Sequence, residues 1–387
     1  MKSSGGMRTG IVLLLFALGG CAGLPQQPAI STADVSWVLN GADANSAAAK
    51  LEPEPLPSLL HVTDEMRRFA LAATQGVFGI SAKATALAAA IGTENGLRLR
   101  YDVDATLTAE QAFVQHRANC LSYTLLFIAL AREVGIPAQF NEVDVPPIWD
   151  LGNDKTLLLY RHINTRIDAY VTYYQIVDVS GEEYSPAYEQ RVISDLTAAA
   201  QFYNNRAVEL RLQKHYADAL KYQLRALELA PDTAYLWTNL ASLYLASHRA
   251  HAARIAVTRA LQLDGASVLN YNAAGHIYEQ LGEQRLAAYF QKRAQYFLDQ
   301  NPYYHYQLAL AALDDHGDEL LAYKETRRAL LLYQKDPRFF FLASILLQRR
   351  GEAELARKAM DVAVALTPDP SQLARYRSKF ARLTEHG

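Results

Sequence analysis

The sequence lacks the features that would place it among metalloproteins, nucleotide-binding proteins or nucleic-acid-binding proteins. Its formal net charge of −2 provides no field that would attract nucleic acid. It has no glycine-rich phosphate loop. His116 precedes Cys120 by four residues, but no second cluster completes a metal site. We therefore expect no metal, no cofactor and no nucleic-acid partner.

The sequence also lacks an apolar run long enough to span a bilayer. Its one apolar run, Ile11 to Leu18, follows Lys2 and Arg8 and is typical of an export signal. The run ends in Leu18-Gly19-Gly20-Cys21, which resembles the lipobox of bacterial lipoprotein signals. The resemblance implies removal of residues 1–20, acylation of Cys21 and, because Ala22 follows, attachment to the outer membrane facing the periplasm. The alternative is an ordinary secretory signal with a chance cysteine.

Residues 21–58 are predicted to be a lipid-anchored tether. They are rich in alanine and lack sustained periodicity. Their prolines are Pro25, Pro28, Pro53, Pro55 and Pro57. We expect folded structure to begin near Leu59.

Only two cysteines occur, so lipidation of Cys21 leaves Cys120 without an intrachain partner. Cys120 stands where a long apolar helix is predicted to begin, and Gly135 with Pro137 ends that helix. A thiol in the first turn lies at the positive end of the helix dipole, which favours the reactive thiolate. The alternative is that Cys120 is a buried small hydrophobic residue.

From Ala138 the pattern changes from helix to strand. A turn at residues 168–170 predicts a hairpin with His162 and Asp178 opposite each other on one face, because 170 is their midpoint. Cysteine, histidine and aspartate, in that order, are the parts of a nucleophile, its base and its orienter. Taken singly, His162 also fits a hydrogen-bonded strand residue and Asp178 a strand-end cap. The predicted strands are 138–145, 156–160, 162–167 and 170–179.

Four short motifs surround these three residues. They are Ala118-Asn119-Cys120, Gly135-Ile136-Pro137-Ala138, Arg161-His162-Ile163-Asn164 and Val177-Asp178. With them, the segment from about Tyr101 to Ser180 resembles the transglutaminase-like branch of the papain-type cysteine superfamily. The chain departs from the family pattern at Ala118 and Asn119, where glycine is common, and at Asn164, where an aromatic residue often follows the histidine by two.

The resemblance implies an α+β, papain-like domain, which we assign to residues 59–193. It implies that Cys120 is the nucleophile, His162 its base and Asp178 the orienter. The implied chemistry is attack on a carboxamide, an acyl-enzyme thioester, and transfer to water or an amine. We expect Asn119 and Trp149 to border the substrate groove; Trp149 fits equally well as a loop residue packed on the core.

The chain from about residue 194 is predicted to be helical and repetitive. Two sets of alanines recur at spacings of 34, 34, 35 and 34 residues. The first set is Ala219, Ala253, Ala287, Ala322 and Ala356, and the second is Ala226, Ala260, Ala294, Ala329 and Ala363. This pattern resembles the tetratricopeptide repeat and implies an all-α solenoid of five units over residues 194–368, followed by a capping helix and tail over 369–387.

Such repeats imply a protein or peptide partner on their concave face. The expected lining positions are Asn204, Thr238, Asn272, Gln307 and Phe341. Two functions follow for the whole chain. The first is an outer-membrane lipoprotein whose cysteine domain hydrolyses or transfers amide bonds of a substrate recruited by the repeats. The alternative is a non-catalytic envelope scaffold that binds proteins through its repeats.

Overall fold

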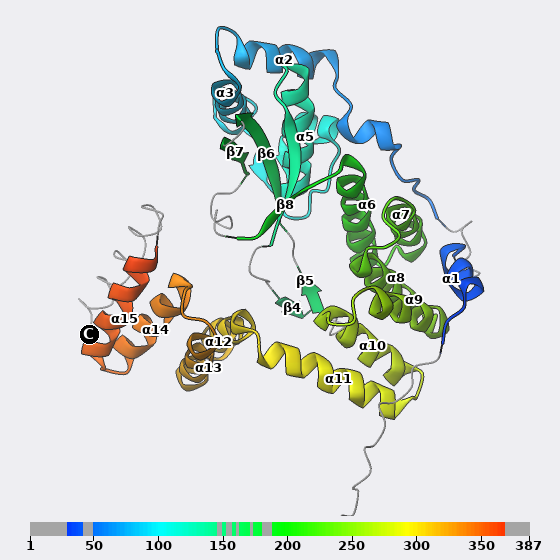
Figure 1. Ribbon diagram of the computed structural model, residues 1–387, viewed down its shortest axis with the longest axis vertical. Helices are drawn as coiled ribbons and strands as arrows, with labels where there is room; N and C mark the ends of the chain where they lie inside the picture. Colours follow the sequence, from blue (N-terminus) through cyan, green and yellow to red (C-terminus); the bar gives the residue numbers. More distant parts are fainter. Residues whose placement is uncertain are drawn as a thin grey trace, which may run out of the picture.

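The computed structural model describes residues 29–41, 49–144, 149–151, 157–159, 162–170, 173–179 and 188–367. The export signal, Cys21 and the predicted capping helix at 369–387 lie outside these residues. Within the described ranges, no helix is both long and apolar enough to cross a membrane. The architecture is an α+β domain followed by paired helices, as the sequence predicts (Figure 1).

The helices of the α+β domain surround one buried helix, α5. Residues 121 to 131 of α5 are all buried, so this helix forms the centre of the domain. The capping box that the sequence predicts at Thr108 and Gln111 is confirmed and starts α4. The helices are η2 (Leu56–Leu60), α2 (Asp64–Thr74), α3 (Ile80–Gly92), α4 (Ala109–Gln115) and α5 (Cys120–Glu133).

A four-stranded antiparallel sheet in the order β7-β6-β3-β8 packs against α5. Its strands are β3 (Ala138–Val143), β6 (His162–Tyr170), β7 (Tyr173–Val177) and β8 (Gln190–Ile193). Two further pairs are the parallel β1 (Arg100–Tyr101) and β2 (Arg117–Ala118), and the antiparallel β4 (Trp149–Leu151) and β5 (Leu157–Leu159). Strand β3 follows α5 in the chain, and β6 runs antiparallel to β3. The start of β6 therefore lies at the same end of the domain as the start of α5.

The β6–β7 hairpin has a different register from the one predicted. Strand β6 continues to Tyr170, past the predicted turn, and a β-bulge interrupts the pairing between Asp168 and Tyr170. Thr165 pairs with Val177, so Asp178 follows opposite Asn164 and not opposite His162. The shift is two positions, and a two-residue shift keeps a side chain on the same face of a sheet. The predicted face is therefore preserved although the predicted pair is wrong.

Ten helices form five consecutive pairs after β8. All ten alanines of the sequence repeat are buried, so they set the close approach of the helices as predicted. The pairs are α6 (Asp195–Leu212) with α7 (Tyr216–Leu229), α8 (Ala234–Ala246) with α9 (Ala250–Leu263), α10 (Val268–Gln280) with α11 (Gln284–Asp299), α12 (Pro302–His316) with α13 (Glu319–Leu332), and α14 (Pro337–Arg349) with α15 (Ala353–Leu366).

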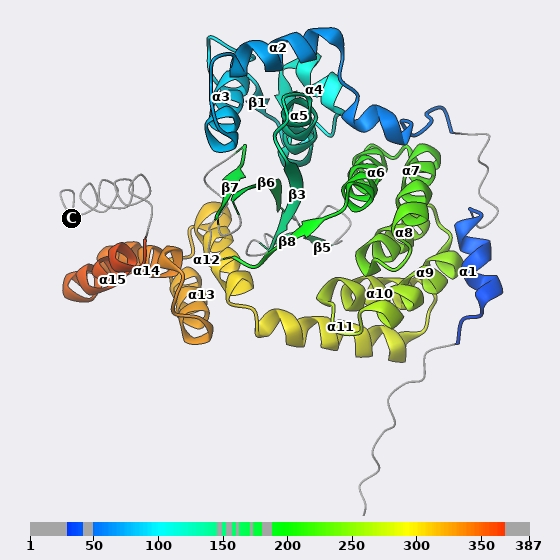
Figure 2. The same cartoon turned by 45° about the horizontal axis from the view of Figure 1, so that its top comes forward.

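The helical array curves around the end of the α+β domain (Figures 1 and 2). The β4–β5 hairpin lies inside this curve, and β5 contacts α10. One hydrophobic cluster runs from the α+β domain through the first three helix pairs as far as Ala294 of α11. Two smaller clusters serve α12 to α14 and α14 to α15. The α+β domain therefore shares its core with the first half of the array.

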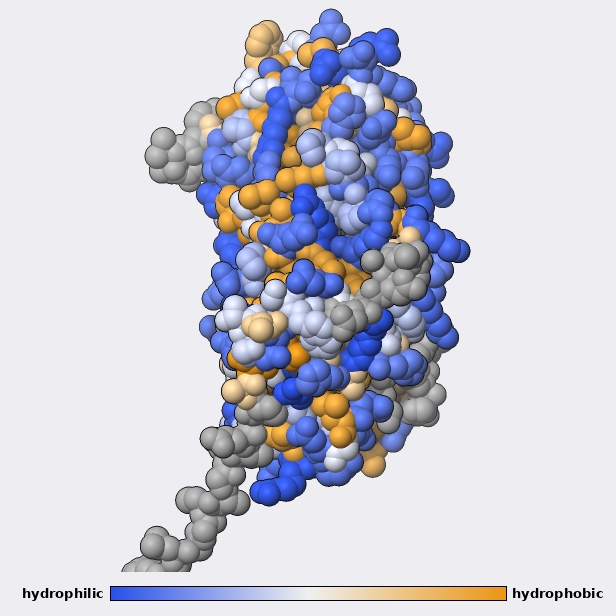
Figure 3. All heavy atoms as spheres, turned by 90° about the vertical axis from the view of Figure 1, so that its right-hand side faces the viewer, coloured by the Kyte–Doolittle hydropathy of each residue, from blue (hydrophilic) through white to orange (hydrophobic). Residues whose placement is uncertain are grey.

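The described part of the predicted tether is bound to the array. We call residues 29–41 and 49–54 the N-terminal strap. It contains a helix that the sequence analysis did not predict, α1 (Thr32–Leu39), which has a capping box and contacts α9. The Tyr244 hydroxyl donates to the Val38 carbonyl at 2.5 Å. Figure 3 shows this side of the molecule, where hydrophobic side chains form small patches among hydrophilic ones.

Asp218 of α7 fixes the second part of the strap. Its Oδ1 accepts the backbone N–H groups of Lys50 and Leu51 at 2.6 and 2.7 Å, and the residue is 7% exposed. The Tyr203 hydroxyl donates to the Glu54 carbonyl at 2.6 Å. In these contacts the strap supplies backbone groups and the array supplies side chains, while Glu52 adds a side-chain ion pair with Lys221 of α7.

We predict that Asp218→Ala releases the strap. Loss of a carboxylate that accepts two hydrogen bonds lowers the free energy of unfolding by about 2 kcal/mol. Limited proteolysis checks this prediction by faster cleavage within residues 42–54. The control is Asp232→Ala, because Asp232 is 83% exposed and makes a surface ion pair with Arg259. Equal cleavage rates in the two variants would contradict the role of Asp218.

Candidate active site

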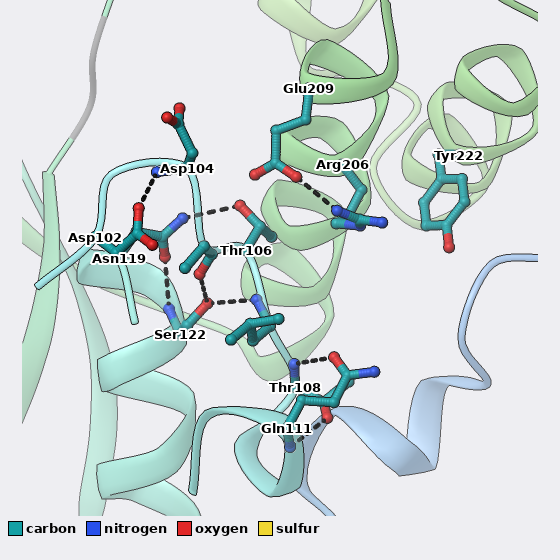
Figure 4. Close-up of polar contacts among 12 residues, drawn as sticks. Asp102, Asp104, Thr106, Thr108, Gln111, Asn119, Ser122, Arg206, Glu209 and Tyr222 are labelled. Carbon is teal, nitrogen blue, oxygen red and sulfur yellow. Dashed lines mark hydrogen bonds and ion pairs between the residues drawn. The ribbon is translucent and has the colours of Figure 1, made fainter. Parts of the chain in front are cut away.

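The nucleophile candidate, Cys120, is the first residue of α5, and its neighbours hold that helix start in place (Figure 4). The Asn119 Oδ1 accepts the Ser122 N–H at 2.9 Å, which caps the helix. The Asn119 amide donates to the Thr106 hydroxyl at 2.8 Å, and Ser122 Oγ donates to the Ala105 carbonyl at 2.9 Å. The side chain of Asn119, expected in a substrate groove, is buried and holds the helix start.

The first helix of the array contacts the same loop. Glu209 of α6 lies close to Thr106 and forms an ion pair with Arg206 at 2.6 Å. Burial raises the pKa of the Glu209 carboxyl, although Thr106 and Arg206 act in the opposite direction. Figure 4 shows Glu209 projecting toward this loop, with Arg206 on its other side, facing Tyr222. Side chains of the array therefore support the loop that holds the helix start.

His162 is the first residue of β6 and lies between Cys120 and Asp178. Its Nε2–H donates to Asp178 Oδ2 at 2.6 Å, and the two side chains are 3% and 8% exposed. Burial alone would lower the pKa of His162. Hydrogen bonds and charge from Asp178 and Cys120 outweigh burial and raise the pKa to about 10. The geometry therefore favours an imidazolium at neutral pH.

The structure brings together the three residues that the sequence singled out. His162 Nε2 is bonded to Asp178, and Cys120 acts on the same imidazole through hydrogen bonding and charge. Cys120 is partly exposed and carries a free thiol. Tyr123, one turn into α5, has its pKa raised by burial and by the negative charge of Asp178. A thiol, an imidazolium and a carboxylate in this order can activate sulfur for attack on a carbonyl.

The structure describes the surroundings of only some of the other predicted residues. Trp149 begins β4, but its side chain lies outside the described residues. Among the concave-face candidates, Asn204 accepts a hydrogen bond from Asn239 at 2.7 Å and Thr238 donates to Asn270. In the part of the chain that the structure describes, no group of three or more His, Cys, Asp or Glu residues could hold a metal ion.

Sequence analysis missed a chain of buried amides behind Asp178. Asn164 Nδ2 donates to Asp178 Oδ2 at 2.9 Å. Asn141 Nδ2 donates to Asn164 Oδ1 at 2.8 Å and to Gln190 Oε1 at 3.0 Å. The signal in the sequence was Asn164 itself, which occupies the place of a common aromatic residue. Asn141 gave a weaker signal, as an amide within an otherwise buried strand.

We predict that Asp178→Asn lowers the pKa of His162 from about 10 toward its ordinary value of about 6.5, because the charge that stabilises the imidazolium is lost. The raised pKa contributes stability that is complete below about pH 6.5 and is lost as the pH rises to about 10. The stability difference between wild type and variant should therefore shrink over this range. Histidine NMR titration and unfolding at several pH values check both statements, with Asp232→Asn as the control.

Comparison with known proteins agrees with this architecture. A transglutaminase-like superfamily model matches residues 67–150, which include Cys120 and end before His162, and a tetratricopeptide repeat model matches residues 200–233. No curated protein matches the chain.

One solved structure that resembles part of this chain is that of pilF of Pseudomonas aeruginosa, with 17% identity over 50% of this chain and 87% of that chain, at a TM-score of 0.27. Another is that of YrrB, described as a TPR protein with an unusual peptide-binding site. It has 19% identity over 46% of this chain and 92% of that chain, at a TM-score of 0.25. A third is that of MamA, with 17% identity over 43% of this chain and 91% of that chain, at a TM-score of 0.25. The family matches and the fold together show a transglutaminase-like domain followed by tetratricopeptide repeats.

Proposed function

We propose that the protein is a cysteine-dependent enzyme that cleaves or transfers amide bonds of a protein or peptide. The observation that carries the proposal is the hydrogen bond of His162 to Asp178, together with the influence of Cys120, the first residue of α5, on the same imidazole. The helix start favours a thiolate at Cys120, and the raised pKa of His162 supplies the imidazolium beside it.

The reaction has two steps. The Cys120 thiolate attacks the carbonyl carbon of a carboxamide, the C–N bond breaks, and the His162 imidazolium gives its proton to the leaving nitrogen. A thioester on Cys120 remains. Water or an amine then attacks the thioester, the neutral imidazole accepts its proton, and the C–S bond breaks to restore the thiolate. Asp178 keeps the ring orientation through both steps.

The repeats support a macromolecular substrate or partner. Tetratricopeptide repeats bind proteins or peptides, and this array curves around the end of the domain (Figures 1 and 2). The α6 side chains also contact the loop beside Cys120. We infer that a bound protein is held by the array close to the thiol.

We predict that iodoacetamide alkylates Cys120 of the intact protein at pH 6 at least about tenfold faster than in the urea-denatured protein. An ordinary thiol has a pKa of about 8.5 and is mostly protonated at that pH. His162→Gln should bring the rate down to the denatured value, because the imidazolium is removed. Peptide mass spectrometry measures the site and the rate.

The same experiment separates enzyme from scaffold. Cys120→Ala should also abolish adduct formation with cell-envelope proteins, detected by intact mass. A native thiol that reacts no faster than the denatured one, with no effect of His162→Gln, would reject the enzymatic function and leave a binding protein.

We further propose that Cys21 is acylated and anchors the protein in the outer membrane. The motif Leu18-Gly19-Gly20-Cys21 supports this proposal, and acyl chains provide anchorage without a transmembrane helix. Cys21→Ser should abolish incorporation of labelled palmitate and move the protein to the soluble periplasmic fraction. Cys120→Ser is the matched control and should keep the label. An unlabelled wild-type protein would contradict the anchor.

A further inference from the structure

We propose that Asn164 is a positioning residue: it fixes the Asp178 carboxylate in the orientation that holds His162, and so controls the reactivity of Cys120. This inference rests on the proposed cysteine chemistry and adds to it a residue that the transglutaminase-like resemblance does not supply.

The first support is that two donors meet on one oxygen. Asp178 Oδ2 accepts from His162 Nε2 at 2.6 Å and from Asn164 Nδ2 at 2.9 Å. In the sheet register Asn164 is the residue of β6 opposite Asp178, while His162 lies two residues earlier on the same face. Rotation of the carboxylate away from His162 therefore also breaks the bond from Asn164.

The second support is that Asn164 is itself held in one orientation. Asn141, paired with Asn164 across β3 and β6, donates to Asn164 Oδ1 at 2.8 Å. If the Asn164 amide flipped, its oxygen would face the Asp178 carboxylate and its NH2 group would face the Asn141 donor. Both contacts would then be repulsive. Asn141 also donates to Gln190 of β8. The orientation of the Asn164 amide is therefore supported by hydrogen bonds that link strands β6, β3 and β8.

The third support is burial. Asn164 is 0% exposed, and a buried amide is unfavourable unless its polar atoms are bonded. An apolar side chain at position 164 would avoid that cost and fill the same space. Compared with an apolar side chain, the Asn164 amide adds one directed donor, Nδ2–H. This donor bonds to the Asp178 carboxylate, which orients the His162 imidazole.

Among the described residues, two groups act on the charge of His162: Asp178, which follows β7, and Cys120, which begins α5. Asp178 also acts on Tyr123 of α5. The partners of Asn164 and Asn141 on β3 and β8 are neutral amides. Because Asn164 donates directly to Asp178, a change at position 164 should act on thiol reactivity through Asp178 and His162.

The test is the rate of alkylation of Cys120 by iodoacetamide between pH 5 and pH 10 in Asn164→Leu, which keeps the volume and removes the donor. We expect a rate at pH 6 about tenfold below wild type, the loss that corresponds to one hydrogen bond to a charged group. The profile should also move toward that of an ordinary thiol, with a midpoint of about 8.5. A purely structural role would lower the melting temperature and leave the profile of the folded variant unchanged.

The matched control is Thr165→Val on the same strand. Thr165 is also 0% exposed, and its Oγ1 has no hydrogen-bond partner within the described residues, so the isosteric change should leave rate and profile at wild-type values. If Asn164→Leu does not fold, Asn164→Ala removes the same donor with a smaller side chain and should show the same loss at pH 6.

Wild-type rates and profile in a folded Asn164→Leu or Asn164→Ala would overturn the inference while leaving the cysteine chemistry intact. Failure of the cysteine chemistry itself has a different signature, since the wild-type thiol would then react no faster than in denatured protein.

Discussion

The site depends on a buried charge pair. His162 and Asp178 are almost fully enclosed, and an isolated charge in such a place is strongly unfavourable. Their direct hydrogen bond offsets part of that cost, and the contact with Cys120 raises the pKa of the imidazole further. The arrangement is stable only if a helix start, a strand start and a strand end meet within hydrogen-bond distance. Most other features of the α+β domain can be understood as means of holding these three ends together.

The β-sheet tolerates some errors of register and not others. The hairpin is displaced by two residues from the symmetric pairing, yet His162 and Asp178 remain on one face and in contact. A displacement of one residue would have separated them. The diagonal placement also leaves Asn164 directly opposite Asp178. The bulge near Asp168 that shifts the register thus brings a second donor to the carboxylate.

Local patterns predicted much of the fold because their causes are local. Residues within about one helical turn determine the capping box at Thr108 and the helix start at Cys120. The repeated alanines follow a fixed period in the sequence, which can be read without the structure. The strap was missed because its partners are far away: Lys50 bonds to Asp218, 168 residues later. Prolines mark an irregular segment, but they do not show whether side chains elsewhere will bind its backbone. The Asn141–Asn164 contact was missed for the same reason, since it requires the register of two strands.

The continuous core has a consequence for the way the repeats relate to the thiol. The first three helix pairs share one hydrophobic cluster with the α+β domain, and Glu209 reaches the helix start through Thr106 and Asn119. A displacement of α6 would therefore act directly on the residue that caps the helix of Cys120. Helix α14 lies beyond the break in the core between α11 and α12, but Asp336 and Arg338 at its start act electrostatically on Tyr188, next to β8. The two halves of the array thus meet the α+β domain differently: the first half shares its hydrophobic core, and the second half meets it through polar groups at Tyr188, two residues before β8.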